Sequence, residues 1–347
     1  MEFDHEAIDD AGLRTEFMHL ALRARNVGRS LHQAYGTNRL PFAFRYINGF
    51  EFNAYASADE SAYRIELNAS VPLFSILLFS RLLSDSQMLP FLDGGGQKAS
   101  AFYVPFVLDP ADFRRRVDWN IELTAIRSFA AGTIADLCST FVLCHEFGHV
   151  LGGHIEGLQH YYRDTRLAEL VAVDPMVSAD TTLRQAWEYE ADLIAALLVV
   201  QFVDELVSDR EVQPRTREVF SDEHGFHFEH TLAIAVVSLF CFFVYVQGMR
   251  LKLNKHSSHP HPHVRATYMK HALLRAAHAR RPVNNEVFHR LLDVRLGEAM
   301  NALELAGLFE PRRYTRRFMQ QVDVELERMN TLYSTHRNSC SAWRWIE

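Results

Sequence analysis

Residues 134–153, IADLCSTFVLCHEFGHVLGG, carry the pattern that decides the fold. The mostly apolar residues of this stretch predict a buried helix. Within it, His145 and His149 are spaced as in an HExxH motif. Positions i and i+4 lie on one face of a helix, so both imidazoles can converge on one metal ion. Glu146 is turned by about 100° from His145 and can reach a water at that metal instead.

A zinc ion with an open coordination position needs a third protein ligand. Glu188 is the favoured candidate, because the ExxxD spacing places Glu188 and Asp192 on one helical face. Asp192 can then accept the outer N–H of one of the two histidines and fix its orientation. The acidic pair leads directly into the apolar run 194–203, where unpaired carboxylates would be costly. Glu169 and Glu190 remain as alternatives to Glu188.

A third cluster is the histidine- and proline-rich stretch 256–265, HSSHPHPHVR. Its prolines predict an extended loop ahead of a helix. His259 or Arg265 would then lie beside the metal and stabilise the oxyanion of a tetrahedral intermediate. The alternatives are a solvated loop or an adventitious metal-binding patch.

In this order, HExxH, ExxxD and HPxPxxR resemble the gluzincin peptidases of the HtpX and CAAX-prenyl-protease type. The resemblance covers about residues 133–270. The soluble phage-exclusion (Lit-type) zinc peptidases are also similar in outline, and the sequence does not separate the two relatives. Membrane members of the first type have several spans, whereas this chain has at most one candidate.

The resemblance implies a role for seven residues. The zinc (Zn²⁺) ligands that it implies are His145, His149 and Glu188. Glu146 is implied as the catalytic acid and base, and Asp192 as the residue that supports the ligands from behind. His259 and Arg265 would border the active site.

The 347-residue chain has 48% hydrophobic and 23% charged residues, a balance that excludes a disordered or fibrous protein. Its net charge of -7 argues against a nucleic-acid partner. Four cysteines without a CxxC pair are typical of a reducing compartment. The acidic start lacks the features of a secretory signal. These observations predict a cytoplasmic protein.

The uncharged segment 231–249 raises the question of a membrane span. Its centre is almost wholly apolar, and basic residues follow it, as on a cytoplasmic flank. A spanning helix needs about 20 apolar residues, so the segment is at the lower limit. A helix buried in a large α-rich domain has the same pattern. We favour the buried helix, with a membrane contact through 231–249 as the alternative.

The whole pattern predicts an α+β fold, with a small antiparallel sheet followed by a mostly helical zincin-like body. Asn48-Gly49 is a hairpin turn signal, and 63–67 and 102–107 predict further strands. The predicted helices are 15–31, 70–83, 121–131, 133–162, 181–207, 228–250, 263–279, 284–307 and 313–334. Three parts are expected: an N-terminal helix and small sheet (1–120), a helical zinc-binding core (121–280), and C-terminal helices that pack on the core (281–347).

The sequence therefore predicts a zinc-dependent metalloendopeptidase that hydrolyses peptide bonds of a protein or peptide substrate by a metal-activated water. An exposed edge of the strands near 50–56 and 63–67 would hold an extended substrate by backbone pairing. One alternative is a catalytically inactive zinc-binding protein that acts through a partner. The other is a membrane-anchored, HtpX-like protease.

Overall fold

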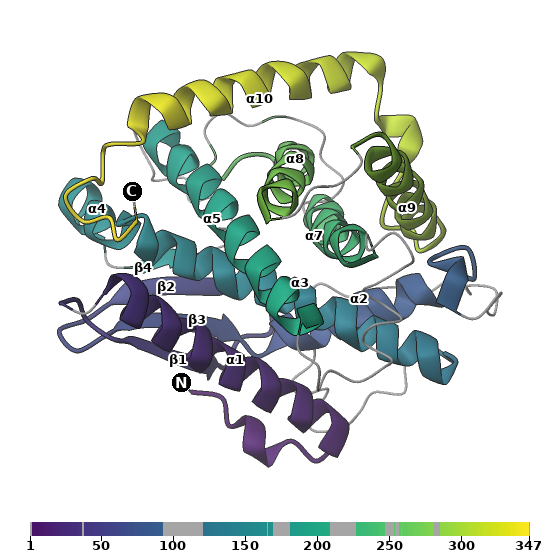
Figure 1. Cartoon of the computed structure of the whole chain (residues 1–347), viewed down its shortest axis with the longest axis horizontal. Helices are drawn as coiled ribbons and strands as arrows, with labels where there is room; N and C mark the ends of the chain where they lie inside the picture. The colour runs from purple at the N-terminus through teal and green to yellow at the C-terminus, as the bar shows by residue number, and fades with distance from the viewer. Residues whose placement is uncertain are drawn as a thin grey trace.

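The chain forms a small sheet that is packed against a larger helical body (Figure 1). The computed structural model describes residues 2–36, 38–92, 121–164, 166–168, 181–208, 227–246, 253, 257, 259–280 and 285–346. The strands are β1 (Phe42–Ile47), β2 (Ala54–Ala58), β3 (Tyr63–Asn68) and β4 (Arg166–Ala168). The helices are α1 (Ala11–Tyr35), α2 (Ser70–Leu83), α3 (Ala125–Leu151), α4 (His154–Tyr162), α5 (Thr181–Ser208), α7 (His227–Val246), α8 (Pro262–Arg280), α9 (Asn285–Leu305) and α10 (Arg316–His336). The predicted α+β class is confirmed.

One boundary differs from the prediction. The helices expected at 121–131 and 133–162 are instead a single long helix, α3, and the short helix α4. Gly132 does not interrupt α3, whereas the chain breaks at Gly152 and Gly153. Gly153 has a φ of +73°, which is accessible to glycine at little cost. The break therefore lies just after the HExxH motif.

The sheet is mixed rather than purely antiparallel, with the strand order β1-β3-β2-β4. The hairpin predicted at Asn48-Gly49 is wrong, because β3 lies between β1 and β2 and pairs in parallel with β1. Gly49 has another role, since a Cβ there would lie 2.1–2.4 Å from atoms of the Asn68 carboxamide. The glycine permits the close approach of the Asn68 side chain instead of a tight turn.

The strand order also changes where a peptide could pair with the sheet. β3 is central and pairs with neighbours on both sides, while β2 pairs with β3 and, over Tyr55–Ser57, with β4. The substrate edge expected along 63–67 is therefore wrong. Among the described strands, the outer positions belong to β1 and β4. The strand predicted at 102–107 lies outside the described residues.

The apolar segment 231–249 is a core helix over its described part, to residue 246. Residues 230–244 of α7 are all buried, and the helix packs against α3, α8 and α9. Of the helices that the structure describes, α3 is the one that is long and apolar enough to cross a membrane by length and composition. A helix of this kind in a protein core passes the same test, and 67% of the apolar window of α3 is buried inside the protein.

Two arginine contacts, one buried and one partly exposed, fix α3 in place. At its start, the guanidinium of Arg127 donates to the backbone carbonyls of Leu83, Asp85 and Met88, each at 3.0 Å. Further along, Arg23 of α1 forms an ion pair with Asp136. Because carbonyls and carboxylates of other segments satisfy these cations, α3 is held in one position relative to α1 and α2.

Candidate metal centre

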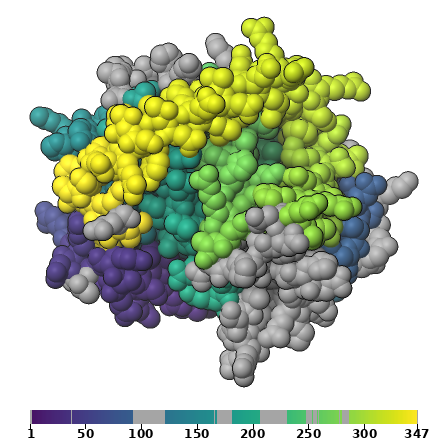
Figure 2. Space-filling view, turned by 45° about the horizontal axis from the view of Figure 1, so that its top comes forward, coloured from purple at the N-terminus to yellow at the C-terminus, as the bar shows by residue number. Residues whose placement is uncertain are grey.

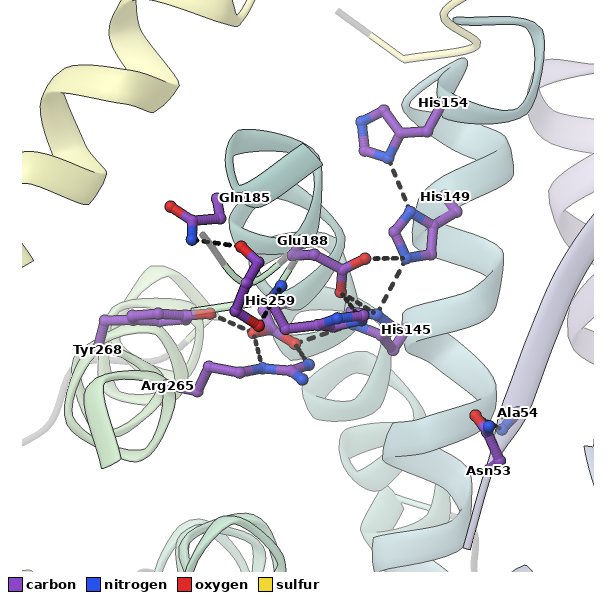
Figure 3. Close-up of polar contacts among 12 residues, drawn as sticks. Asn53, Ala54, His145, His149, His154, Gln185, Glu188, His259, Arg265 and Tyr268 are labelled. Carbon is purple, nitrogen blue, oxygen red and sulfur yellow. Dashed lines mark hydrogen bonds and ion pairs between the residues drawn. The ribbon is translucent and has the colours of Figure 1, made fainter. Parts of the chain in front are cut away.

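Three buried side chains converge where α5 crosses α3 (Figure 3). The Nε2 atoms of His145 and His149 are 3.1 Å apart. The carboxylate oxygens of Glu188 lie 3.3 Å from His145 Nε2 and 3.5 Å from His149 Nε2. One ligand atom from each residue lies within 4.8 Å of the other two. Two imidazole nitrogens and a carboxylate are a donor set that zinc takes, with a coordination position left open.

A glycine allows the two helices to approach closely enough to assemble this group. A Cβ at Gly148 would lie 2.8 Å from the carbonyl oxygen of Ala191 and 3.0 Å from its Cα. Both atoms belong to the backbone of α5, which cannot move aside as a flexible side chain could. Gly148 therefore lets α5 bring Glu188 against the two histidines of α3.

A carboxylate holds the His145 ring at Nδ1, the nitrogen that is directed away from the metal group. Its Nδ1 lies 2.9 Å from Asp192 Oδ1. Arg265 of α8 donates to both oxygens of Asp192, at 2.9 and 2.8 Å, and the Tyr268 hydroxyl also donates to it. Burial alone would raise the pKa of Asp192, but Arg265 and the His145 contact bring it below its ordinary value. The charged carboxylate fixes the His145 ring with Nε2 towards the metal group.

His149 is held in a different way. Its Nδ1 lies 3.0 Å from the Nδ1 of His154, the first residue of α4. His154 Nε2 in turn lies 3.0 Å from Glu190 Oε2. Burial, together with the neighbouring His145 and His154, places the pKa of His149 well below its usual value. The ring is therefore neutral, which is the form that binds a metal ion.

A comparison with known protein families agrees with this geometry. The profile described as peptidase family M48 matches residues 136–273. Over residues 136–273, this chain belongs to peptidase family M48. No curated protein and no solved structure matched the chain. The protein is thus a zinc metalloendopeptidase of the M48 family, with His145, His149 and Glu188 as its buried metal-binding group.

The other candidates for a third ligand lie elsewhere. The carboxylate of Glu190 contacts His154 and Arg344. Burial would raise the pKa of Glu190, but the contacts with these two residues lower it. Glu169 lies outside the described residues. Among the described residues, Glu188 is the carboxylate that joins the two histidines of this M48 peptidase.

Glu146 and His259 are two predicted site residues that are not members of the metal-binding group. Glu146 is buried on α3 beside His145. His259 Nε2 lies 3.3 Å from Glu188 Oε2, and its side chain is 14% exposed against 4% for Glu188. His259 is therefore at the rim of the group.

The structure brings six of the seven predicted site residues into one network of polar contacts, from His145, His149 and Glu188 outward to Asp192, His259 and Arg265. Arg265 turns its guanidinium to Asp192. Two supports were not predicted. Tyr268 lies three residues after Arg265 on α8, a spacing that shares a helix face, so it could have been found. His154 follows the helix break at Gly153, and no periodicity connects it to His149.

Proposed function

We propose that Glu146 is the acid and base with which this M48 peptidase cleaves internal peptide bonds of protein substrates. The observation that carries the proposal is the position of Glu146 relative to the metal group. In the described part of the chain, that group consists of His145, His149 and Glu188. Glu146 is next to His145 in the sequence, is buried beside the group, and is not one of its members. A carboxylate in this position is suited to proton transfer.

Bound zinc would supply a Lewis acid that polarises the scissile carbonyl and lowers the pKa of water. Glu146 would take a proton from the attacking water and deliver it to the nitrogen of the leaving amine. His259 is more exposed than Glu188. It would donate a hydrogen bond to the carbonyl oxygen of the substrate as negative charge develops there. Arg265 would act as a positioning residue, because its guanidinium holds Asp192 and Asp192 holds His145.

We further propose a cytoplasmic location for the peptidase. All four cysteines are free and buried, a usage typical of a reducing compartment. Cell fractionation without detergent tests this point. We expect the full-length chain in the soluble fraction, and recovery only after detergent extraction would contradict the proposal.

The role of Glu146 is tested with Glu146→Gln, which keeps the shape of the side chain and removes its base. General acid–base catalysis contributes typically about 10²- to 10⁴-fold, so we expect cleavage of a fluorescently labelled unfolded protein to fall by that order. Zinc content, measured by elemental mass spectrometry, should stay at the wild-type level. Glu205→Gln, at an exposed glutamate of α5, is the matched control and should cleave normally.

Two results would contradict the proposal. Full cleavage by Glu146→Gln would show that another group moves the proton. Loss of zinc from this variant would place Glu146 among the ligands.

A further inference from the structure

We propose that the C-terminal end of the chain orients a zinc ligand, with Arg344 and His154 as positioning residues for His149. The proposal rests on the metal-binding group of the M48 peptidase and not on the catalytic role of Glu146. It concerns a line of contacts that runs from the metal group to the surface and crosses three separate segments of the chain.

The contacts form a continuous series. His149 Nδ1 lies 3.0 Å from His154 Nδ1, and His154 Nε2 lies 3.0 Å from Glu190 Oε2. The second oxygen of Glu190 forms an ion pair with Arg344, which is 154 positions further along the chain. His149, His154 and Glu190 are buried. His154 also stacks on Trp187, with the ring centroids 5.5 Å apart.

The order of donors and acceptors fixes the tautomers along this series. Since His149 presents Nε2 to the metal group, its Nδ1 is the outer nitrogen and carries the hydrogen. His154 Nδ1 must then accept that hydrogen, which leaves His154 Nε2 as a donor to Glu190. The Glu190 carboxylate accepts from His154 on one oxygen and from Arg344 on the other. Each group therefore has a partner of the required kind.

The tail that carries Arg344 is fixed to the end of the HExxH helix. The backbone N–H of Trp345 donates to the carbonyl of Leu151 at 2.9 Å. The Trp345 ring packs against Phe42 and Tyr63, with centroids 5.1 and 5.4 Å away. A Cβ at Gly153 would lie 2.9 Å from the backbone nitrogen of Arg344. The tail therefore lies closely over the helix break that precedes His154.

The figures show the same arrangement. The C-terminus lies beside α4 in Figure 1, after the tail has returned from the end of α10. In Figure 2 the yellow C-terminal segment lies on the surface, between the purple N-terminal part and the teal helices. A surface segment thus reaches a zinc ligand through two buried side chains.

The test measures zinc affinity rather than cleavage. His154→Phe keeps a ring on Trp187 and removes both nitrogens, while His154→Gln again offers an acceptor beside a donor. Loss of an outer partner of a ligand typically weakens metal binding about 10- to 100-fold, and we expect this for His154→Phe by chelator competition. Arg344→Met should weaken binding by about tenfold, the lower end of that range, because it acts one contact further away. His154→Gln should recover most of the affinity.

Arg39→Met is the matched control. Arg39 donates to the backbone carbonyl of Arg344 and lies over the Trp345 ring, with 5.9 Å from its guanidinium carbon to the ring centroid. It therefore contacts the same tail at the Arg344 backbone and the Trp345 ring, and zinc affinity should stay at the wild-type level. The Co²⁺-substituted protein gives a second reading, since its visible absorption bands should shift in His154→Phe and Arg344→Met but not in Arg39→Met.

Two results would overturn the proposal. Wild-type zinc affinity in both His154→Phe and Arg344→Met would show that His149 needs no support from the tail. Equal weakening by Arg39→Met and Arg344→Met would assign the effect to docking of the tail and not to the contact with Glu190. Thermal unfolding of the metal-free variants separates both results from a failure to fold. Failure of Glu146→Gln to lose activity would leave this test unaffected.

Discussion

His145 and His149 lie one turn apart on α3, yet different parts of the molecule hold them. Asp192 contacts His145 directly and is itself held by α8. His149 is reached through a second imidazole, whose carboxylate partner is held by Arg344. The supports of His145 all lie within the segment 136–273 that matches the family profile, whereas Arg344 lies beyond it. The matched segment therefore contains every residue that supports His145, but it ends before Arg344, the last residue of the series that supports His149.

The two supports also differ in their exposure to water. The side chains of Asp192 and Arg265 are 0% and 2% exposed, while those of Glu190 and Arg344 are 9% and 11% exposed. Removal of one partner from a buried ion pair leaves an uncompensated charge, which is strongly destabilising. Removal of one partner from a pair that is nearer to water destabilises the protein less, because solvent screens the charge that remains. The Asp192 side should therefore be the more sensitive of the two.

The largest effect is expected for Asp192→Asn, which keeps the side-chain shape and removes the charge. It leaves Arg265 buried without its counter-ion, at a cost of about 3–5 kcal/mol in the free energy of unfolding. Zinc affinity should also fall, by about 10- to 100-fold, because His145 loses its charged partner. Denaturant titration of the metal-free protein and chelator competition measure the two effects.

Glu190→Gln makes the same change on the other side and completes the comparison. It should cost less in unfolding free energy than Asp192→Asn, since Arg344 is closer to solvent. Equal losses from the two variants would show that the difference in burial has no energetic consequence. A larger loss from Glu190→Gln would reverse the proposed order.

A smaller effect is expected where α3 meets α5. In Gly148→Ala, the new Cβ would meet backbone atoms of Ala191, and overpacking of this kind typically costs about 1–3 kcal/mol. Because the two helices must separate, Glu188 should move away from both histidines and zinc affinity should fall. Gly132→Ala is the control on the same helix, where a Cβ would meet nothing within 4 Å. It should stabilise the protein by about 0.5–1 kcal/mol, as expected for alanine in place of a helical glycine. Calorimetry of both variants decides whether the stability change at Gly148 comes from the close contact with Ala191 or from the replacement of a helical glycine.

The parts of the centre that the sequence predicted share one physical basis. Within a continuous helix, spacing determines which residues lie on one face. His145 and His149 on α3, and Glu188 and Asp192 on α5, could therefore be paired from their positions alone. The apolar segment of α7 was placed in the core on other grounds, because it is apolar on all sides and at the lower length limit of a membrane span. Local periodicity was sufficient wherever one element supplied both members of a pair.

The remaining features depend on contacts between distant segments. The turn signal at Asn48-Gly49 predicted a hairpin, but β3 lies between the two strands and a parallel pairing replaces it. His154 follows a left-handed glycine, and Arg344 lies in an irregular tail. Neither position belongs to a repeating pattern that connects it to His149. Their roles follow only from the tertiary structure.

The smallest effect concerns the thiols, and it separates the tail from the helix that it supports. Burial raises the pKa of Cys138 and Cys144 on α3 to about 12, and that of Cys340 in the tail to about 11. A thiol is reactive as the thiolate, so each should react slowly with a maleimide in the native protein. Cys340 becomes accessible when the tail alone is released, whereas the α3 thiols require a larger opening.

We therefore expect Cys340 to be labelled before Cys138 and Cys144, as followed by mass spectrometry of peptides over time. Arg344→Met should speed the labelling of Cys340 and leave the rates of the α3 thiols unchanged, because it removes a contact of the tail only. Simultaneous labelling of all three thiols would mean that the tail does not open independently of the core. The two supports would then unfold as one unit, and the contrast between them would be limited to their effects on zinc affinity.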